Sequence, residues 1–135
     1  MTDVLLTHGY FLDEDPKERE IMKPYPPLGL LYVAAYLRRD GVSVEVFDTT
    51  FATRDALVVR LSTAPAGVLG VYTNLITRGS VLGIVAEAKA RGWTVVLGGP
   101  EAANYPAEYL ACGAGACSRR PRASTSGSGT GTRGP

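Results

Sequence analysis

Cysteine is scarce in this chain: Cys112 and Cys117 are the only two among 135 residues. Two cysteines do not make the disulfide framework of a small secreted domain. The first residues, Met1-Thr2-Asp3, lack the basic start of a secretory signal. Arg, Asp or Gly interrupts each apolar run well before it reaches the length of a membrane span. These absences predict a soluble protein of the reducing cytoplasm.

Acidic and large apolar residues are both absent from the end of the chain. Residues 115–135 hold four Arg, no Asp or Glu, and no Val, Ile, Leu, Phe, Tyr or Trp. Such a segment cannot bury enough apolar surface to offset its conformational entropy, so we expect 115–135 to be a disordered tail rich in Gly, Ser, Thr and Arg. Residues 1–114 hold 10 Lys and Arg against all 13 Asp and Glu, a balance of −3. A mildly acidic body does not suit a nucleic-acid surface.

Residues 1–114 have the pattern of one α/β domain. The pattern predicts strands at 4–6, 42–47, 68–73 and 93–97, which alternate with helices at 27–39, 53–61, about 81–91 and about 104–112. The charged segment 10–25 is predicted to be a solvated loop. The helix that begins at Pro27 is apolar on most sides, which predicts that it packs deep in the fold. This order predicts a doubly wound parallel sheet of the flavodoxin-like type, in which ligands bind beyond the carboxyl ends of the strands.

The pattern breaks off after Ala114, where a fifth strand is due. Four strands are recognisable, and we expect the fifth strand and its helix to be missing, so that the domain 1–114 is incomplete. Two explanations stay open: a natural flexible tail, or a truncated or frame-shifted end. We favour the second because the break falls where a strand should begin. The strand around Val95–Leu97 would then be a bare apolar edge.

Several common chemistries of such a sheet have no support in the sequence. A dinucleotide site needs a glycine-rich turn after the first strand, but Thr7-His8-Gly9 offers a single glycine. The phosphate-binding pattern of nucleotide hydrolases does not occur. A phospho-receiver site needs clustered acids at the strand ends, and only Asp48 lies at such a place.

Three segments carry a resemblance to a known family. They are PYPPLGLLYVAAYLRRDGVSVEVFD at 24–48, GVYTNL at 70–75 and VVLGGPEAANYP at 95–106. Together they resemble the N-terminal cobalamin-binding domain of cobalamin-dependent radical S-adenosylmethionine enzymes, a group that includes Mg-protoporphyrin ester cyclases and methyltransferases. The resemblance covers about residues 3–114.

The resemblance implies a module that holds cobalamin (vitamin B12) and presents one axial face to a radical-generating partner domain absent from this chain. The chain has no Cys-x3-Cys-x2-Cys motif, so we expect no iron–sulfur cluster in it and no catalysis by it alone. No nucleic-acid or membrane partner is implied. Glycines let a long, flat ligand approach the backbone, and short polar side chains can bond its amides and phosphate. The implied cofactor-binding residues are Thr7, His8, Gly29, Tyr72, Thr73, Asn74, Leu75, Gly98, Gly99, Pro100 and Glu101.

His8 is the only histidine in the chain. The Asp-x-His-x-x-Gly motif that supplies a cobalt ligand in other cobalamin proteins is absent, so the resemblance implies a base-off cofactor without such a histidine. Ligation of cobalt by His8 stays open, but a histidine bonded within the protein at a strand end is the favoured interpretation. Two other functions also stay open: a nucleotide- or flavin-binding enzyme domain on the same sheet, and a non-functional fragment or interaction module.

Overall fold

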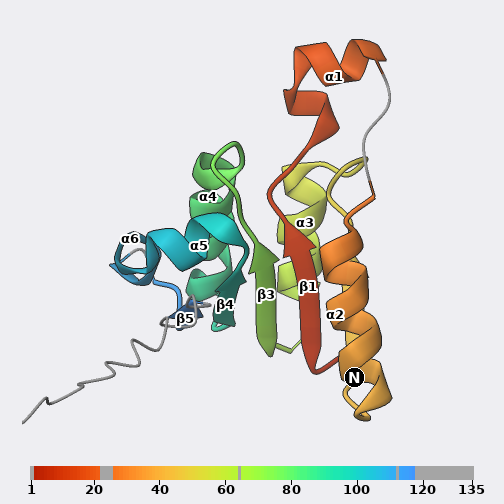
Figure 1. Ribbon diagram of the computed structural model, residues 1–135. Coiled ribbons are helices and arrows are strands. Elements are labelled where there is room, and N and C mark those ends of the chain that lie inside the picture. Colours follow the sequence, from red (N-terminus) through yellow and green to blue (C-terminus); the bar gives the residue numbers. More distant parts are fainter. Residues whose placement is uncertain (1, 22–25, 64, 112, 118–135) are drawn as a thin grey trace, which may run out of the picture.

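A computed structural model describes residues 2–21, 26–63, 65–111 and 113–117, shown in Figure 1. Five strands alternate with helices along the chain. In order they are β1 Val4–His8, the 3-10 helix η1 Leu12–Glu14, α1 Pro16–Ile21, α2 Leu28–Arg39, β2 Val44–Phe47, α3 Arg54–Thr63, β3 Val68–Tyr72, α4 Arg78–Ala90, β4 Thr94–Gly98, α5 Pro100–Asn104, α6 Pro106–Ala111 and β5 Ala116–Cys117. Cys112 and the segment after Cys117, about which the sequence made predictions, lie outside the described residues.

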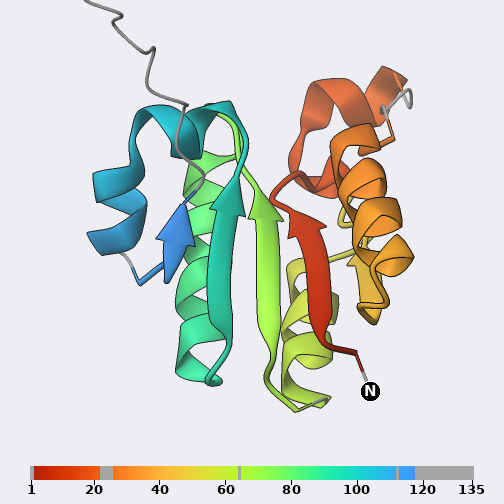
Figure 2. The same ribbon diagram turned by 60° about the horizontal axis from the view of Figure 1, so that its bottom comes forward.

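All strand pairs in the sheet are parallel, and the strand order is β2-β1-β3-β4-β5. This order confirms the predicted doubly wound, flavodoxin-like fold. The direction of strand order reverses between β1 and β3, which is the place where such sheets bind ligands. In Figure 2, α3 and α4 lie on one face of the sheet and α2 lies on the other.

The predicted fifth strand is not entirely missing, because two residues form a short strand, β5. We expected disorder from residue 115, but Ala116 pairs with Val96 and Cys117 pairs with Leu97. A parallel ladder joins backbone groups, so it does not require large side chains. The edge of β4 is therefore partly covered, in place of the bare edge that the sequence predicted.

Two apolar cores of unequal size hold the layers together. The larger contains the buried residues of α3, α4 and α6 with alternate residues of β1, β3 and β4, such as Leu5, Val71 and Leu97. The smaller lies on the opposite face, where Leu30 and Ala34 of α2 pack on β1 and β2. Of the helices that the structure describes, α2 is the one that packs into this core, so the core is small.

Three local predictions need correction. Segment 10–25 is not all loop, since η1 and α1 form within it; the proline at the start of α1 suits the first helical turn. The helix predicted at about 104–112 forms as α6, with Pro106 at its start, but the segment before it, predicted as a loop after the strand at 93–97, contains the short helix α5. The third correction concerns α2, which is not packed deep: Leu31 and Tyr32 are exposed. Among the described residues, no helix is long and apolar enough to cross a membrane.

Candidate functional site

Three residues lie side by side at the carboxyl ends of β1, β3 and β4. The register pairs His8 with Tyr72, and Tyr72 with Gly98. Since paired residues of parallel strands point to the same face, these three form a row on the face that carries α2. The row below it is Leu6, Gly70 and Val96.

The part of this face formed by β3 and β4 has no helix over it among those that the structure describes. Figure 1 shows β3 in full view between α2 on one side and α5 with α6 on the other. Tyr72 and Val96 are accordingly exposed, although their neighbours Val71 and Leu97 on the other face are buried. Parallel sheets are normally covered on both faces, so this open strip is where a ligand or another element fits.

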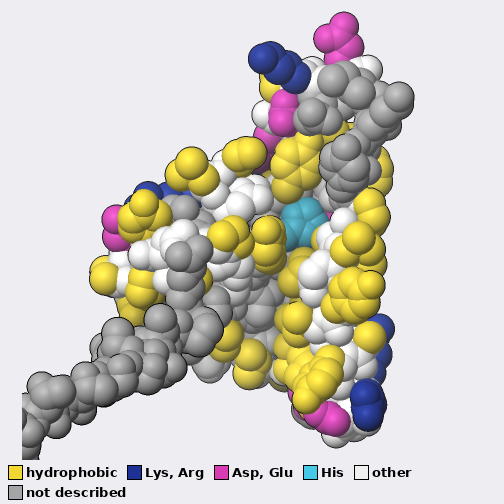
Figure 3. Space-filling model, in the orientation of Figure 1, with side chains coloured by type: hydrophobic (Ala, Val, Ile, Leu, Met, Phe, Trp, Pro, Cys, Tyr) yellow, Lys and Arg dark blue, Asp and Glu magenta, His cyan; other side chains and the backbone are white. Residues whose placement is uncertain are grey.

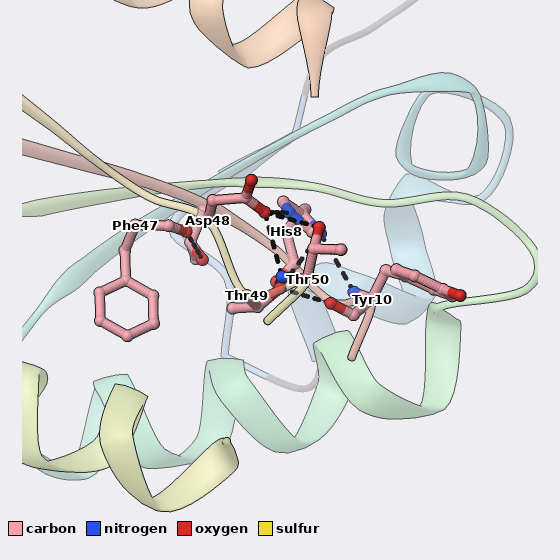
Figure 4. Close-up of polar contacts among 7 residues, drawn as sticks. His8, Tyr10, Phe47, Asp48, Thr49 and Thr50 are labelled. Atoms are coloured by element: carbon pink, nitrogen blue, oxygen red, sulfur yellow. Dashed lines mark hydrogen bonds and ion pairs between the residues drawn. The ribbon is translucent and has the colours of Figure 1, made fainter. Parts of the chain in front are cut away.

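His8 is the centre of a polar cluster that joins the ends of β1 and β2 (Figure 4). Its Nε2 lies 2.7 Å from Oδ1 of Asp48, and its Nδ1 accepts the backbone N–H of Tyr10 at 3.2 Å. The Thr49 hydroxyl donates to the Tyr10 carbonyl oxygen at 2.7 Å. Because a backbone N–H can only donate, Nδ1 is the acceptor and Nε2 carries the proton that Asp48 accepts. Both ring nitrogens are thus engaged within the protein.

Asp48 is held in its charged form by this cluster. Burial is the largest single influence and opposes ionisation, but hydrogen bonds from the Thr50 hydroxyl, from His8 and from the Thr50 backbone N–H together outweigh it and lower the pKa of Asp48. The hydroxyl bond from Thr50 measures 2.7 Å. The rim between β1 and β2 therefore carries a fixed negative charge.

Internal hydrogen bonds fix the loop after β3. The Thr73 hydroxyl lies 3.0 Å from the hydroxyl of Tyr109, and both residues are fully buried. Oδ1 of Asn74 accepts the Thr77 backbone N–H at 3.0 Å at the start of α4. These contacts engage the Thr73 hydroxyl and the Asn74 side-chain oxygen, and Leu75 is exposed at the tip of the loop.

The two adjacent glycines after β4 have different surroundings. Gly99 has φ +101°, and a Cβ there would lie 2.4 Å from the Thr73 carbonyl oxygen and 2.9 Å from the Tyr72 ring. Glycine is required at this position by the fold itself. Gly98 has no positive φ, and a Cβ there would meet nothing within 4 Å. The missing side chain at Gly98 therefore leaves open space on the site's face.

The remaining predicted residues divide between the rim and the interior. Gly29, in the first turn of α2, also has open space where a Cβ would stand. Pro100 is exposed as the first residue of α5, and Glu101 follows it in that helix. Thr7 is not at the surface: it is fully buried, and its hydroxyl donates to the Phe47 carbonyl oxygen at 2.7 Å.

The sequence analysis placed Asp48 at a strand end but gave it no role in the site, and it missed Thr49 and Thr50, which follow directly. Tyr72 and Leu75 were predicted as site residues and are exposed. Three further exposed apolar side chains of the rim were missed, namely Phe51, Ile76 and Tyr105. His8 is only 7% exposed, and Figure 3 shows the visible part of the histidine, in cyan, among hydrophobic side chains, in yellow. Such a rim suits a large ligand with an apolar face.

Comparison with known families gives one assignment. Among curated proteins, none matches this chain. A family model described as "B12 binding domain" matches residues 19–125, which is well over half of the chain. The match begins after β1 and extends beyond β5, and it agrees with the parallel sheet and its open carboxyl rim. The chain belongs to the family of B12-binding domains.

Proposed function

We propose that this protein is a cobalamin-binding module and that the cofactor docks at the carboxyl rim of β1, β3 and β4. The apolar rim side chains would contact the flat corrin, and the open strip beside Tyr72 and Gly98 would receive the nucleotide tail. The single observation that carries this proposal is Gly98. Neither its backbone conformation nor its packing requires a glycine, so the space beside it is available to a ligand.

The polar cluster around His8 supports a base-off cofactor without a histidine ligand. A cobalt ligand must offer an unprotonated ring nitrogen. Nε2 of His8 carries a proton that points toward Asp48. If that proton moved to Nδ1, two N–H donors, that of Nδ1 and the backbone N–H of Tyr10, would face each other. His8 thus acts in this proposal as a link between the ends of β1 and β2. Asp48 and Thr50 complete a polar border, which can form hydrogen bonds with amide groups of the ligand.

The partner in this proposal is a radical S-adenosylmethionine domain on another polypeptide or elsewhere in a parent protein. Bound cobalamin would supply a cobalt centre that can carry a methyl group. This chain's own residues would bind the ligand, orient it and exclude water at the apolar rim. The module would not be catalytic by itself, and it would work in the cytoplasm. The resemblance of residues 24–48, 70–75 and 95–106 to that enzyme group supports this part of the proposal.

Titration of the purified full chain with hydroxocobalamin tests the proposal. We expect a saturable change in the cofactor's absorbance and heat on mixing, and a base-off spectrum that His8→Ala leaves unchanged in shape. Gly98→Leu fills the open space and should weaken binding at least about tenfold, which corresponds to about 1.4 kcal/mol. The control is Gly83→Ala in α4, where a Cβ would meet only the Arg54 guanidinium at 3.5 Å.

Three outcomes would contradict the proposal. They are no binding by the wild-type chain, equal binding by Gly98→Leu, and an equal loss in Gly83→Ala. Flavin mononucleotide is titrated in parallel, because binding of flavin in place of cobalamin would favour the alternative of a flavin site on the same sheet. Circular dichroism and thermal melting of each variant confirm that it is folded before binding is compared.

A further inference from the structure

Helix α2 has the sequence of a buried helix but a largely exposed surface. Only Leu30 and Ala34 are buried, where they pack on β1 and β2. Leu28, Leu31, Tyr32, Val33 and Tyr36 are exposed, with 72% of Tyr32 and 65% of Tyr36 accessible. Polar residues appear only in the last turn, as Arg38 and Arg39. A helix that is apolar on all sides is normally covered on all sides.

The described part of this chain does not provide a cover for that outer face. Helices α5 and α6 lie at the other edge of the sheet, where they contact β4 and β5 (Figure 1), and their buried residues Ala102 and Tyr109 belong to the larger core. Residues 118–135 contain no Val, Ile, Leu, Met, Phe, Tyr or Trp, so they have no large apolar side chains with which to bury it. Figure 3 shows hydrophobic side chains along α2.

The exposed face of α2 has a shape that fits a second helix like itself. Leu28, Tyr32 and Tyr36 are four residues apart and form one ridge along the helix. On either side of this ridge stand small residues, Gly29 and Ala35, which make shallow grooves. Interdigitation of such i, i+4 ridges is the commonest way in which two helices pack. The ridge of one copy can therefore enter the groove beside the ridge of another copy.

The size of the face fits a weak, reversible dimer. A tyrosine can bury about 150–250 Å², so the two exposed tyrosines together with three exposed aliphatic residues offer about 500 Å² per copy. This is near the upper limit of apolar patches on ordinary monomers. Two such faces bury about 1,000 Å², which is the lower limit for a specific interface.

We propose that the exposed face of α2 is a self-association surface, on which a second copy of this chain packs its own α2 antiparallel around a two-fold axis near Tyr32. In such a contact the same patch serves both copies. The two Tyr32 side chains lie close to the axis and face each other's grooves. The contact uses the outer surface of α2 and does not involve Gly98, on which the proposed cofactor site rests. Of the residues predicted to bind the cofactor, it shares only Gly29 in the first turn of α2.

Sedimentation velocity over about a hundredfold range of protein concentration tests this proposal, because a weak dimer depends on concentration. Tyr32→Glu places two carboxylates near the axis and should weaken dimerisation at least about tenfold. The matched control is Val59→Glu on α3, which changes a side chain that is 58% exposed on the opposite face of the sheet. We expect Val59→Glu to dimerise like the wild type.

A second measurement locates the axis. In a background with Cys112→Ser and Cys117→Ser, Tyr32→Cys should form a disulfide-linked dimer under mild oxidation, whereas Val59→Cys should not. A wild-type chain that stays monomeric at every concentration overturns the proposal, as does a dimer that Tyr32→Glu leaves intact. Each measurement is repeated with and without hydroxocobalamin, so that failure to dimerise and failure to bind the cofactor are observed separately.

Discussion

Replacement of Gly99 by alanine tests the most constrained point of the rim. The substitution puts a Cβ at φ +101° and 2.4 Å from the Thr73 carbonyl oxygen. A residue with a side chain in that backbone region costs about 1–3 kcal/mol, and the forced contact adds about 1–3 kcal/mol. We therefore expect Gly99→Ala to lower the free energy of unfolding by about 2–6 kcal/mol, a large share of the roughly 5–15 kcal/mol that is typical of a domain.

The neighbouring glycine provides the control for this experiment. A Cβ at Gly98 meets no atom within 4 Å, so Gly98→Ala should keep the free energy of unfolding within about 0.5 kcal/mol of the wild type. Urea unfolding can be followed by the fluorescence of Trp93, which is buried and donates its Nε1–H to the Leu61 carbonyl oxygen. A Gly99→Ala protein as stable as Gly98→Ala would refute the strain that we assign to this turn.

Two further substitutions test the polar contacts of the rim. The pKa of Asp48 lies below its ordinary value of 3.8 in the folded state, so its contacts stabilise the fold above that pH and cease to do so as the pH falls through the lowered pKa. Asp48→Asn should thus have a lower free energy of unfolding than the wild type at neutral pH, and this difference should shrink below about pH 4. Urea unfolding at several pH values measures it. A difference that does not change with pH would contradict the expectation. Tyr109→Phe leaves the buried Thr73 hydroxyl without its partner and should cost about 1–3 kcal/mol. Tyr105→Phe, at an exposed ring, should cost under about 0.5 kcal/mol, and equal losses in both tyrosine variants would show that the hydrogen bond contributes little.

The sequence by itself determined the order of the elements and the type of sheet. The periodicity of apolar residues that defines a helix or a strand is a local property of the chain, so it can be read from the sequence. Gly41 and Gly92 likewise mark the ends of two helices, where both have positive φ angles. Alternation of strands and helices then leaves few topologies other than a parallel sheet. The loops at the strand ends could therefore be predicted as the candidate site, together with the Gly98-Gly99 pair.

Tertiary structure alone decided what the individual residues of that site do. His8 and Asp48 are 40 positions apart and meet because β1 pairs with β2, and no local pattern encodes that contact. The burial of Thr73 depends on Tyr109 arriving from α6. Two identical adjacent glycines proved different because only one faces the Thr73 carbonyl oxygen. The apolar outer face of α2 is exposed for the same reason: a sequence specifies which side chains avoid water, but the packing of distant elements decides which of them are covered.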